Sequence, residues 1–467
     1  MISHFPSKEP IANYTDIVDL SGTRKSVVNS FSVKYGRELQ SAVTYYVTQH
    51  FGSSLCDLMG HERMQQFINN PPNDPPYDLV ITEYFGSMCY LGFGPFLKAP
   101  VAIGVALLDS PFVNDFMGNP MNYAFFSGAM NQNAVVTTFF DRLWNFVNNF
   151  KETQLFYRYT SDQTDRMRKY LGQDLPDIRQ LEKKVSLAFM YGHHSIHGIR
   201  PVTPGILEIG GLHVEADKSV LTPELKSWLD SANHGVVYFT FGSLLNIETL
   251  PQSTILGLYA SFAKISPVKV LMKCANATRL PPGLPSNMIT SPWIPQVAVF
   301  RHRNTRIFIT HGGLMGTEEA IYHGIPMIGI PVFADQAKNV NIMVHKNVAV
   351  QMHIDNITES SMDAALNALL HDPQYRESAR KMSKLFRDRP MSIMDTAVYW
   401  TEYVIRNGPD SLKSPAVDMP WWKLNMIDVS AFLISCLALG VYFLTALLKL
   451  VLRRLCKKAS HQKKKLK

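Results

Sequence analysis

The feature that most constrains this chain is an uncharged apolar stretch near its C-terminus. Residues Val429 to Leu448 form a run of 20 residues without Asp, Glu, Lys or Arg. As a helix rising about 1.5 Å per residue, this run spans about 30 Å, the thickness of a bilayer core. A buried core helix is the alternative, but it is rarely this long without a charge. We therefore predict one transmembrane helix over 429–448, with most of the chain before it.

The residues on either side of this stretch predict an orientation in the membrane. Trp421, Trp422 and Lys423 precede it, as in an interfacial belt, and residues 449–467 contain nine Lys or Arg and no acid. Because Lys and Arg accumulate on the cytosolic side, we expect a basic cytosolic tail and a lumenal body. Without these nine charges the net charge of +8 falls to −1 for residues 1–448, which argues against a nucleic-acid partner.

Short motifs agree with a single-pass protein of the endoplasmic reticulum membrane. Lys464 and Lys465 stand fourth and third from the C-terminus and resemble a dilysine retrieval signal, although a generic basic flank is the alternative. Asn13, Asn276 and Asn356 each begin an Asn-x-Thr glycosylation sequon. Five Cys in a chain of 467 residues exclude a disulfide scaffold.

The start of the chain does not fit a lumenal body. Such a body needs an N-terminal signal of roughly 15–30 residues with a basic and an apolar part. Residues Met1 to Pro6 show neither part. Either this segment is missing from the chain, or the last span alone directs insertion and the body stays in the cytosol.

The first half of the body alternates strand-like and helix-like patterns. Residues 77–82 and 100–105 are predicted buried strands, and residues 134–172 are predicted helical, with aromatic residues between charges. Residues 84–108 are apolar but are interrupted by Lys98 and two prolines, which favours strand, loop and strand in a core over a second span. Strands alternating with helices predict a parallel α/β sheet.

A second alternating pattern follows a boundary rich in Pro and Gly between Gly198 and Gly211. Two α/β halves joined by one linker predict a cleft between their sheet ends, where ligands bind in such folds. The predicted elements of this half are strands at 235–241, 268–273, 288–290, 306–310 and 326–331 and a helix over 252–265.

A Gly-Gly turn marks a candidate anion site in this half. A strand over 306–310 runs into His311-Gly312-Gly313, and a short helix over 314–322 follows. Such a turn lets backbone N–H groups at the helix start approach an anion closely. We predict a phosphate there, with a plain tight turn as the alternative.

Four short segments within residues 293–336 share a recognisable pattern. They are Trp293-Ile294-Pro295-Gln296, Thr310-His311-Gly312-Gly313, Glu319-Ala320-Ile321-Tyr322-His323-Gly324-Ile325-Pro326 and Phe333-Ala334-Asp335-Gln336. Together they resemble the signature of the UDP-glycosyltransferases, most closely the membrane-bound animal UDP-glucuronosyl and UDP-glucosyl transferases of insect type. The resemblance extends over nearly the whole chain. It implies a GT-B fold, with two Rossmann-like domains facing a cleft, in addition to the transmembrane helix.

The resemblance also implies a division into domains. An N-terminal acceptor-binding domain precedes a linker and a C-terminal UDP-sugar-binding domain, and a membrane-proximal stem leads to the span. The implied ranges are 1–199 for the first domain, 200–214 for the linker, 215–405 for the second domain, 406–428 for the stem, 429–448 for the span and 449–467 for the tail.

For the nucleoside end of the donor, the resemblance implies three contacts. The indole of Trp293 stacks on uracil, because it offers a flat apolar face to a base. Gln296 lies beside it. The Glu319 carboxylate accepts hydrogen bonds from the vicinal ribose hydroxyls.

For the phosphates and the sugar, the resemblance implies two further groups. His311 and the amides of the two glycines after it hold the pyrophosphate, and Ser243 adds a hydroxyl. Asp335 and Gln336 hold the sugar hydroxyls. The chain departs from the usual family pattern at Met315, where an Asn is common, and a Met side chain cannot hydrogen-bond a phosphate.

The catalytic base is the largest departure from the family. In the family it is a His at the start of a first helix, which has no counterpart here, and His4 lies on the wrong element for that role. The family's orienting Asp aligns with Glu83, the one catalytic candidate in this chain. Since general-base help is typically about 10²–10⁴-fold, we expect weak or no activity from the chain as given. A missing strand would also expose a sheet edge.

The predicted function is inverting transfer of glucose or glucuronic acid from a UDP-sugar to a hydroxyl of a small lipophilic acceptor, as in detoxification or in hormone or pigment conjugation. UDP-glucose or UDP-glucuronate is then a co-substrate, and no cofactor or metal is expected. Membrane lipid is an expected partner, and homo- or hetero-oligomers are left open. The alternative is a catalytically silent UDP-sugar-binding membrane protein that associates with full-length relatives.

A metalloenzyme is the third interpretation. His193, His194 and His197 have a spacing that permits metal ligation. The surrounding Gly, Ser and Pro residues predict a loop, and no carboxylate or Cys stands close by in the sequence. No metal site is therefore predicted.

Overall fold

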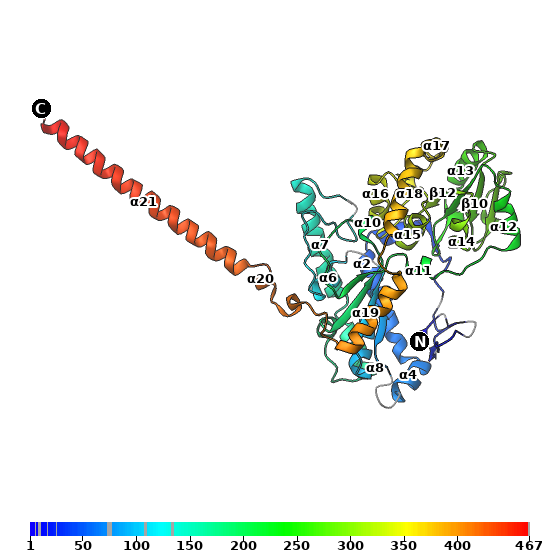
Figure 1. Cartoon of the computed structure of the whole chain (residues 1–467), viewed down its shortest axis with the longest axis horizontal. Helices are drawn as coiled ribbons and strands as arrows, with labels where there is room; N and C mark the ends of the chain where they lie inside the picture. The colour runs from blue at the N-terminus through cyan, green and yellow to red at the C-terminus, as the bar shows by residue number, and fades with distance from the viewer. Residues whose placement is uncertain are drawn as a thin grey trace. The chain divides into compact units, whose positions relative to one another are not determined.

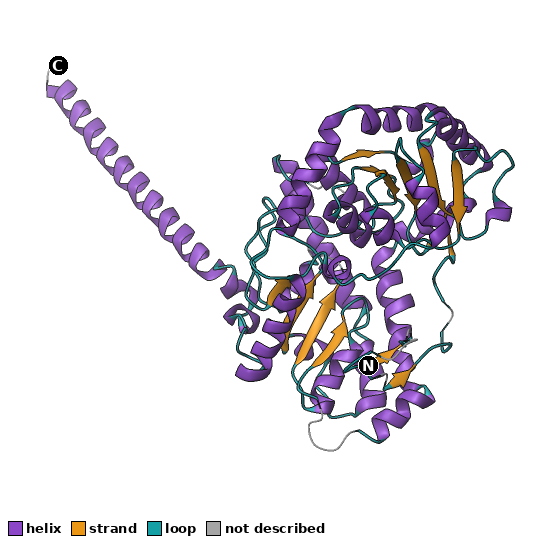
Figure 2. Ribbon diagram, turned by 45° about the vertical axis from the view of Figure 1, so that its right-hand side comes forward, coloured by secondary structure: helices purple, strands orange, loops and turns teal. Residues whose placement is uncertain are grey.

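The structure is a computed structural model that describes residues 1–465 except 5, 8–10, 16, 25, 72–76, 107–109 and 132–134. It divides into two compact units, Met1–Ser414 and Pro415–Lys467, each described here by itself. The first unit contains two lobes, each built on a parallel sheet with helices around it (Figures 1 and 2).

The first lobe is built on a four-stranded parallel sheet. Its strand order is β4 (Val80–Glu83), β5 (Val101–Val105), β6 (Val185–Met190) and β7 (Ile206–Glu208). Every side chain of β6 is buried, as expected for a central strand covered on both faces. The longer helices of this lobe are a π-helix (Tyr46–Ser53), α4 (Glu62–Asn69), α5 (Phe93–Leu97), α6 (Pro111–Phe116), α7 (Phe139–Tyr159), α8 (Gln163–Leu171) and α9 (Ile178–Glu182). Helix α1 (Val33–Gln40) instead buries Val33 and Leu39 in the core of the second lobe.

Most elements predicted for this lobe are present. Strands β4 and β5 correspond to the predicted strands at 77–82 and 100–105, and helices α7 and α8 fill the predicted helical region. The aromatic residues of α7 lie largely outside the core, since Phe139, Trp144 and Phe150 are 63, 61 and 61 % exposed.

Residues 84–108 do not form the predicted strand, loop and strand. A 3₁₀-helix over Cys89–Gly92 and helix α5 precede β5. Phe93 and Leu97 stand four residues apart and are both buried, which is the spacing of one helix face. Lys98, with a φ of 54°, ends the helix in the left-handed region. A disulfide between Cys56 and Cys89 ties this segment to α3 (Ser54–Cys56).

Strand β4 forms one edge of the first-lobe sheet. Ile81 is 61 % exposed there, and Glu83 is exposed at the end of the strand. The two strands nearest the N-terminus, β1 (Ile2–Ser3) and β2 (Val18–Asp19), pair with each other outside this sheet. Among the described residues, no strand pairs with the other side of β4.

The second lobe is built on a six-stranded parallel sheet that contains every strand predicted between 235 and 331. Its order is β11 (Met288–Ser291), β10 (Lys269–Lys273), β8 (Val236–Thr240), β12 (Thr305–Thr310), β13 (Met327–Gly329) and β14 (Ala349–Gln351). The lobes are joined by a pairing of β3 (Phe31–Ser32) with β9 (Leu245–Asn246). The helices of this lobe are α12 (Pro223–Asp230), α13 (Gln252–Lys264), α14 (Gln296–Arg301), α15 (Leu314–Tyr322), α16 (Gln336–His345), α17 (Glu359–His371) and α18 (Pro373–Arg387).

Helix α19 (Ile393–Asn407) packs differently from the sequence division, which grouped it with the second domain. Its buried residues Ile393 and Val404 join a core cluster with Leu187 and Phe189 of β6. The chain therefore returns to the first lobe after completing the second. The reason is that the apolar face of α19 covers one face of the first-lobe sheet.

The second unit contains α20 (Trp421–Leu424) and α21 (Ile427–Lys465). Within α21, Ile427–Ala459 is long and apolar enough to cross a membrane, and its apolar window is not buried. The helix includes the predicted span 429–448 and continues through the basic tail. Leu, Arg and Lys dominate that tail and favour helix, so the end of the apolar run does not end the helix.

Candidate active site

The carboxyl ends of the second-lobe strands converge on a cleft of about 480 Å³. Because all six strands are parallel, the loops after β8, β11, β12 and β13 meet at one edge of the sheet. First-lobe residues Val47, Phe85, Ala106 and Met130 complete the wall. The predicted donor residues that line this cleft are Ser243, Trp293, Gln296, His311, Gly313, Glu319, Asp335 and Gln336.

Gly312 is the one predicted donor residue that does not line the cleft. Its N–H donates to Thr310 Oγ1 at 3.1 Å, and its carbonyl accepts from Asn339 Nδ2 at 3.0 Å. Its φ is +83°, and a Cβ there would lie 2.4 Å from Val340 Cγ2. The amide of Gly312 is therefore used inside the protein. The backbone amides left for the predicted phosphate contact are those of Gly313 and of the first turn of α15.

Glu319 is held from two sides. Gln296 Nε2 donates to Glu319 Oε2 at 2.5 Å, and His213 Nε2 lies 3.3 Å from Glu319 Oε1. His213 belongs to α11 (Leu212–Glu215), just after the linker glycines. Burial of the His213 ring opposes its charged form, but the carboxylates of Glu319 and Glu318 outweigh this effect and raise its pKa. The sequence analysis missed His213, although it directly follows the linker segment that carried the resemblance.

His311 enters the site as a neutral ring. A Cβ on Gly242 would lie 2.7 Å from His311 Cε1, so the ring packs directly on the turn after β8. Burial, and then the charge of Lys273, lower the pKa of His311 to about 4. Its Nδ1 is buried without a hydrogen-bond partner among the described residues. At neutral pH this imidazole can exchange a hydrogen bond with a ligand but brings no positive charge.

Lys273 supplies a positive charge that the sequence analysis did not find. It ends β10, is 8 % exposed, and is the only Lys or Arg among the described residues that line the cleft. Its Nζ donates to Asn29 Oδ1 at 2.5 Å and to the Gly242 carbonyl at 2.9 Å, and it lies 5.7 Å from the centre of a Trp293 ring. Burial lowers its pKa. Its position at the carboxyl end of a strand was the available signal.

Asp335 and Gln336 lie at the other end of the cleft. Gln336 Oε1 accepts from the backbone N–H groups of Val332 and Phe333 at 2.9 and 3.0 Å, so only its Nε2 remains to contact a ligand. Asp335 Oδ2 accepts from Asn339 Nδ2 at 2.6 Å. Burial raises the pKa of Asp335, and the bond from Asn339 opposes that rise.

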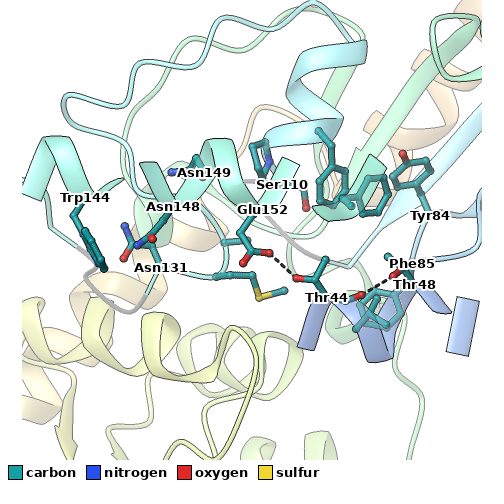
Figure 3. Close-up of a pocket in the computed structure, with 17 residues that line it drawn as sticks. Thr44, Thr48, Tyr84, Phe85, Ser110, Asn131, Trp144, Asn148, Asn149 and Glu152 are labelled. Atoms are coloured by element: carbon teal, nitrogen blue, oxygen red, sulfur yellow. Dashed lines mark hydrogen bonds between the residues drawn. The ribbon is translucent and has the colours of Figure 1, made fainter. Parts of the chain in front are cut away.

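A second cavity, of about 340 Å³, lies in the first lobe and adjoins the cleft. It shares Val47, Phe85 and Met130 with the cleft lining. Figure 3 shows its aromatic walls and the carboxylate of Glu152, which projects into it from α7. The two adjoining cavities offer space for two ligands, one on each lobe.

Glu83 and His4 lie outside both cavities. Glu83 ends β4 and lines none of the three largest cavities described. His4 lines a third, mostly apolar cavity, which meets the donor cleft at Leu244, Phe333 and Ala334. Its Nε2 is buried without a partner, and burial followed by the charge of Arg24 lowers its pKa.

A carboxylate lies beside the histidines that the sequence analysis considered as metal ligands, contrary to the expectation that none is near. The ligand atoms of His193, His194 and Glu208 lie within 4.8 Å of one another. The sequence missed Glu208 because β7 returns beside this segment, and residues His194–His197 form a helical turn rather than a loop. Arg200 lies 3.4 Å from the same carboxylate, so an ion pair already balances its charge.

Comparison with known proteins decides the family. The family described as "UDP-glucoronosyl and UDP-glucosyl transferase" matches residues 73–464. The chain belongs to this family. It is 34 % identical over 439 residues to UDP-glucosyltransferase 2 of Dactylopius coccus, and this alignment covers 93 % of this chain and 83 % of the relative. It is 32 % identical over 324 residues to UDP-glucuronosyltransferase 2A2 of Mus musculus, and this alignment covers 69 % of this chain and 60 % of the relative.

Solved structures of glycosyltransferases share the fold of this chain. Glycosyltransferase VinC in complex with DTDP matches 84 % of this chain and 88 % of its own, with a TM-score of 0.55 and 13 % identity. The glycotransferase of kitacinnamycin matches 76 % and 83 %, with a TM-score of 0.53 and 16 % identity. The predicted GT-B fold is confirmed, and the chain is a glycosyltransferase by family.

Replacing Asn339 with Ala should shift the pH dependence of sugar transfer. Loss of its hydrogen bond should raise the pKa of Asp335 further, and the hydrogen bond predicted from a sugar hydroxyl needs the carboxylate form as acceptor. As the pH falls, kcat/KM for the UDP-sugar should therefore decline at a higher pH than in the wild type. His345→Ala, on an exposed position of the same helix, is the control. Coincident acid limbs in Asn339→Ala and wild type would exclude Asp335 as the titrating group.

Proposed function

We propose that this chain transfers a hexosyl group from a UDP-sugar to a hydroxyl of a small lipophilic acceptor with inversion at the anomeric carbon. One observation carries the proposal. The donor residues predicted from separate loops line one cleft of the second lobe, and an aromatic cavity of the first lobe opens onto the same cleft.

The nucleoside end of the cleft suits uridine. Trp293 is 60 % exposed and leaves a ring face free for a base. Gln296 fixes one oxygen of Glu319, and burial of this side chain keeps the carboxylate in place to accept from two ribose hydroxyls. Preorganisation of this kind lowers the entropy cost of binding.

The middle of the cleft suits a diphosphate. Lys273 contributes positive charge, and the N-terminal turn of α15 presents backbone N–H groups and the positive end of its dipole. The neutral His311 adds one hydrogen bond. Together these groups stabilise the negative charge that develops on the departing UDP.

The placement of the two substrates supports a single displacement. A donor on the second lobe presents its anomeric carbon toward the first lobe, where the acceptor cavity lies. The acceptor oxygen then attacks from the side opposite to UDP, and the configuration inverts. Holding both substrates in this way converts a bimolecular reaction into an effectively unimolecular one.

Glucose is the favoured sugar. A glucuronate carboxylate requires a cation near Asp335 and Gln336, and Lys338 was the only one near them in the sequence. Lys338 is buried and donates to the Ser127 carbonyl at 2.5 Å. It does not line the cleft, and the one Lys or Arg among the described residues that does is Lys273.

The silent UDP-sugar-binding protein remains the second candidate. One observation favours it: among the described residues, no His lines the acceptor cavity, His311 is the one His that lines the cleft, and Glu83 lines neither space. A protein of this kind would bind UDP normally but would not transfer the sugar.

Glu319→Ala should weaken UDP binding by about 1–3 kcal/mol, because charge-assisted hydrogen bonds to the ribose are lost. Isothermal titration calorimetry on the purified full chain measures this change. Glu377→Ala removes an exposed carboxylate from α18 of the same lobe and should leave the affinity unchanged. Equal UDP affinity in Glu319→Ala and wild type would refute the donor site.

In competition, UDP-glucose should support more transfer to a phenol than UDP-glucuronate at equal concentration. The physical reason is the missing cation at the sugar end of the cleft. Products of one reaction containing both donors are separated and counted. Preferred glucuronide formation would contradict the sugar assignment, and intact UDP binding without either product would favour the silent candidate.

We also propose that the body lies in the lumen of the endoplasmic reticulum and that the basic end of α21 is cytosolic, with Lys464 and Lys465 as a retrieval signal. Two observations support this orientation. The Cys56–Cys89 disulfide is of the kind that persists in oxidising compartments. Asn13, Asn276 and Asn356 are all exposed.

With a lumenal body, glycosidase treatment of the microsomal protein should lower its apparent mass. The triple substitution of Asn13, Asn276 and Asn356 to Gln should abolish that change, since no other sequon is present. Gel mobility before and after treatment is the measurement. A wild-type protein without any glycosidase-sensitive shift would place the body in the cytosol.

A further inference from the structure

The first-lobe cavity combines aromatic walls with a single charge. Phe112 and Phe156 stack with ring centres 3.7 Å apart, and Trp144 and Phe85 line other parts of the wall. Tyr84 uses its hydroxyl to donate to the buried Glu182 at 2.6 Å, so it presents only its ring. Aromatic faces of this kind attract organic cations as well as apolar groups.

Glu152 is the only charged side chain among the described residues that line this cavity. Thr44 Oγ1 donates to Glu152 Oε2 at 2.5 Å, which orients the carboxylate (Figure 3). The described residues place no Lys, Arg or His within ion-pair distance of it. The second carboxylate oxygen is therefore available to a ligand.

Most other polar groups of the wall are already used. Asn131 and Asn149 both donate to Asn145 Oδ1, at 3.1 and 2.8 Å, and Asn145 donates to two backbone carbonyls. Asn148 makes no side-chain hydrogen bond with the other described residues and lies one helical turn before Glu152 on α7. The polar contacts open to a ligand are thus an amide and a carboxylate on one face of α7.

We propose that Glu152 makes this cavity selective for acceptors that carry a protonated amine in addition to the hydroxyl that receives the sugar. The inference rests on the proposed function and names the substrate class of the same site. An ammonium group in the cavity pairs with the carboxylate and contacts the aromatic faces. An acceptor with a carboxylate is repelled by the same charge.

The position of the cavity relative to the cleft fits a molecule with two functional groups. Val47, Phe85 and Met130 line both spaces and mark the passage between them. An amphiphile with its amine at Glu152 can direct its other end through this passage toward the sugar. A phenol with a short aminoalkyl chain is the simplest compound of this class.

A purely structural role for Glu152 is the competing explanation. Thr44 belongs to α2 (Val43–Tyr45), so its bond to Glu152 also ties α2 to α7. Glu152→Gln separates the two roles, because Gln keeps an oxygen that accepts from Thr44 but loses the negative charge.

The test compares 4-(2-aminoethyl)phenol with 4-ethylphenol, which share the ring and the reacting hydroxyl but differ in charge. With UDP-glucose and the full chain in microsomes, Glu152→Gln should lower the ratio of kcat/KM for the amine to that for the neutral phenol by about tenfold, mainly through KM. Glu62→Gln makes the same charge change at an exposed position of α4 and should keep the wild-type ratio.

An unchanged ratio in Glu152→Gln, or an equal loss for both phenols, would overturn the proposal in favour of the structural role. If wild type glycosylates neither phenol, calorimetry replaces turnover. The amine should then bind the UDP-saturated wild type about tenfold more tightly than Glu152→Gln. Equal binding overturns the inference, whereas unequal binding supports it even though transfer, and with it the proposed function, has failed.

Discussion

The packing of one imidazole ring on one glycine organises the donor cleft. His311 follows β12 and Gly242 follows β8, and the two strands are neighbours in the sheet. Gly242 has a φ of +75°, and any side chain there would collide with the ring. This contact lets the two turns meet closely, and it places the Gly242 carbonyl where Lys273 can donate to it. The Lys273 charge, the His311 ring and the start of α15 all line the cleft around this contact.

Helix α15 connects that cleft to the linker between the lobes. Glu319 faces the cleft, whereas its neighbour Glu318 is fully buried and accepts from the Gly211 N–H at 3.0 Å. Burial, opposed by His213 and the Gly211 bond, raises the pKa of Glu318 to about 7. Two adjacent carboxyl groups therefore serve different purposes, one toward the ligand and one toward the linker. A change in the linker can act on the donor site through a single helix.

Sequence patterns located five of the six strands of the second-lobe sheet, all but β14, and the helices α13 and α15, and they placed the predicted donor residues in loops that line one cleft. Each strand there is a short apolar run before a turn, and the loops at the carboxyl ends of parallel strands necessarily share one edge. The patterns failed where a position depends on a distant segment. Lys273 and His213 act through contacts with residues far away in the chain, and Glu208 joins His193 and His194 only because β7 returns beside them.

The sequence by itself determined the family, the apolar span of the second unit, the two α/β lobes and the loops that carry the predicted donor residues, because each depends on local composition and spacing. The tertiary structure decided which of those residues face the cleft. In the folded chain the Gly312 amide donates to Thr310, and the Gln336 side-chain carbonyl accepts from a backbone N–H of its own loop. Lys338 is buried outside the cleft and donates to the Ser127 carbonyl. The tertiary structure also placed Glu152 in an aromatic cavity. The physical reason is that a polar group can contact a ligand only when the folded chain has not already satisfied it, and that balance is settled by packing.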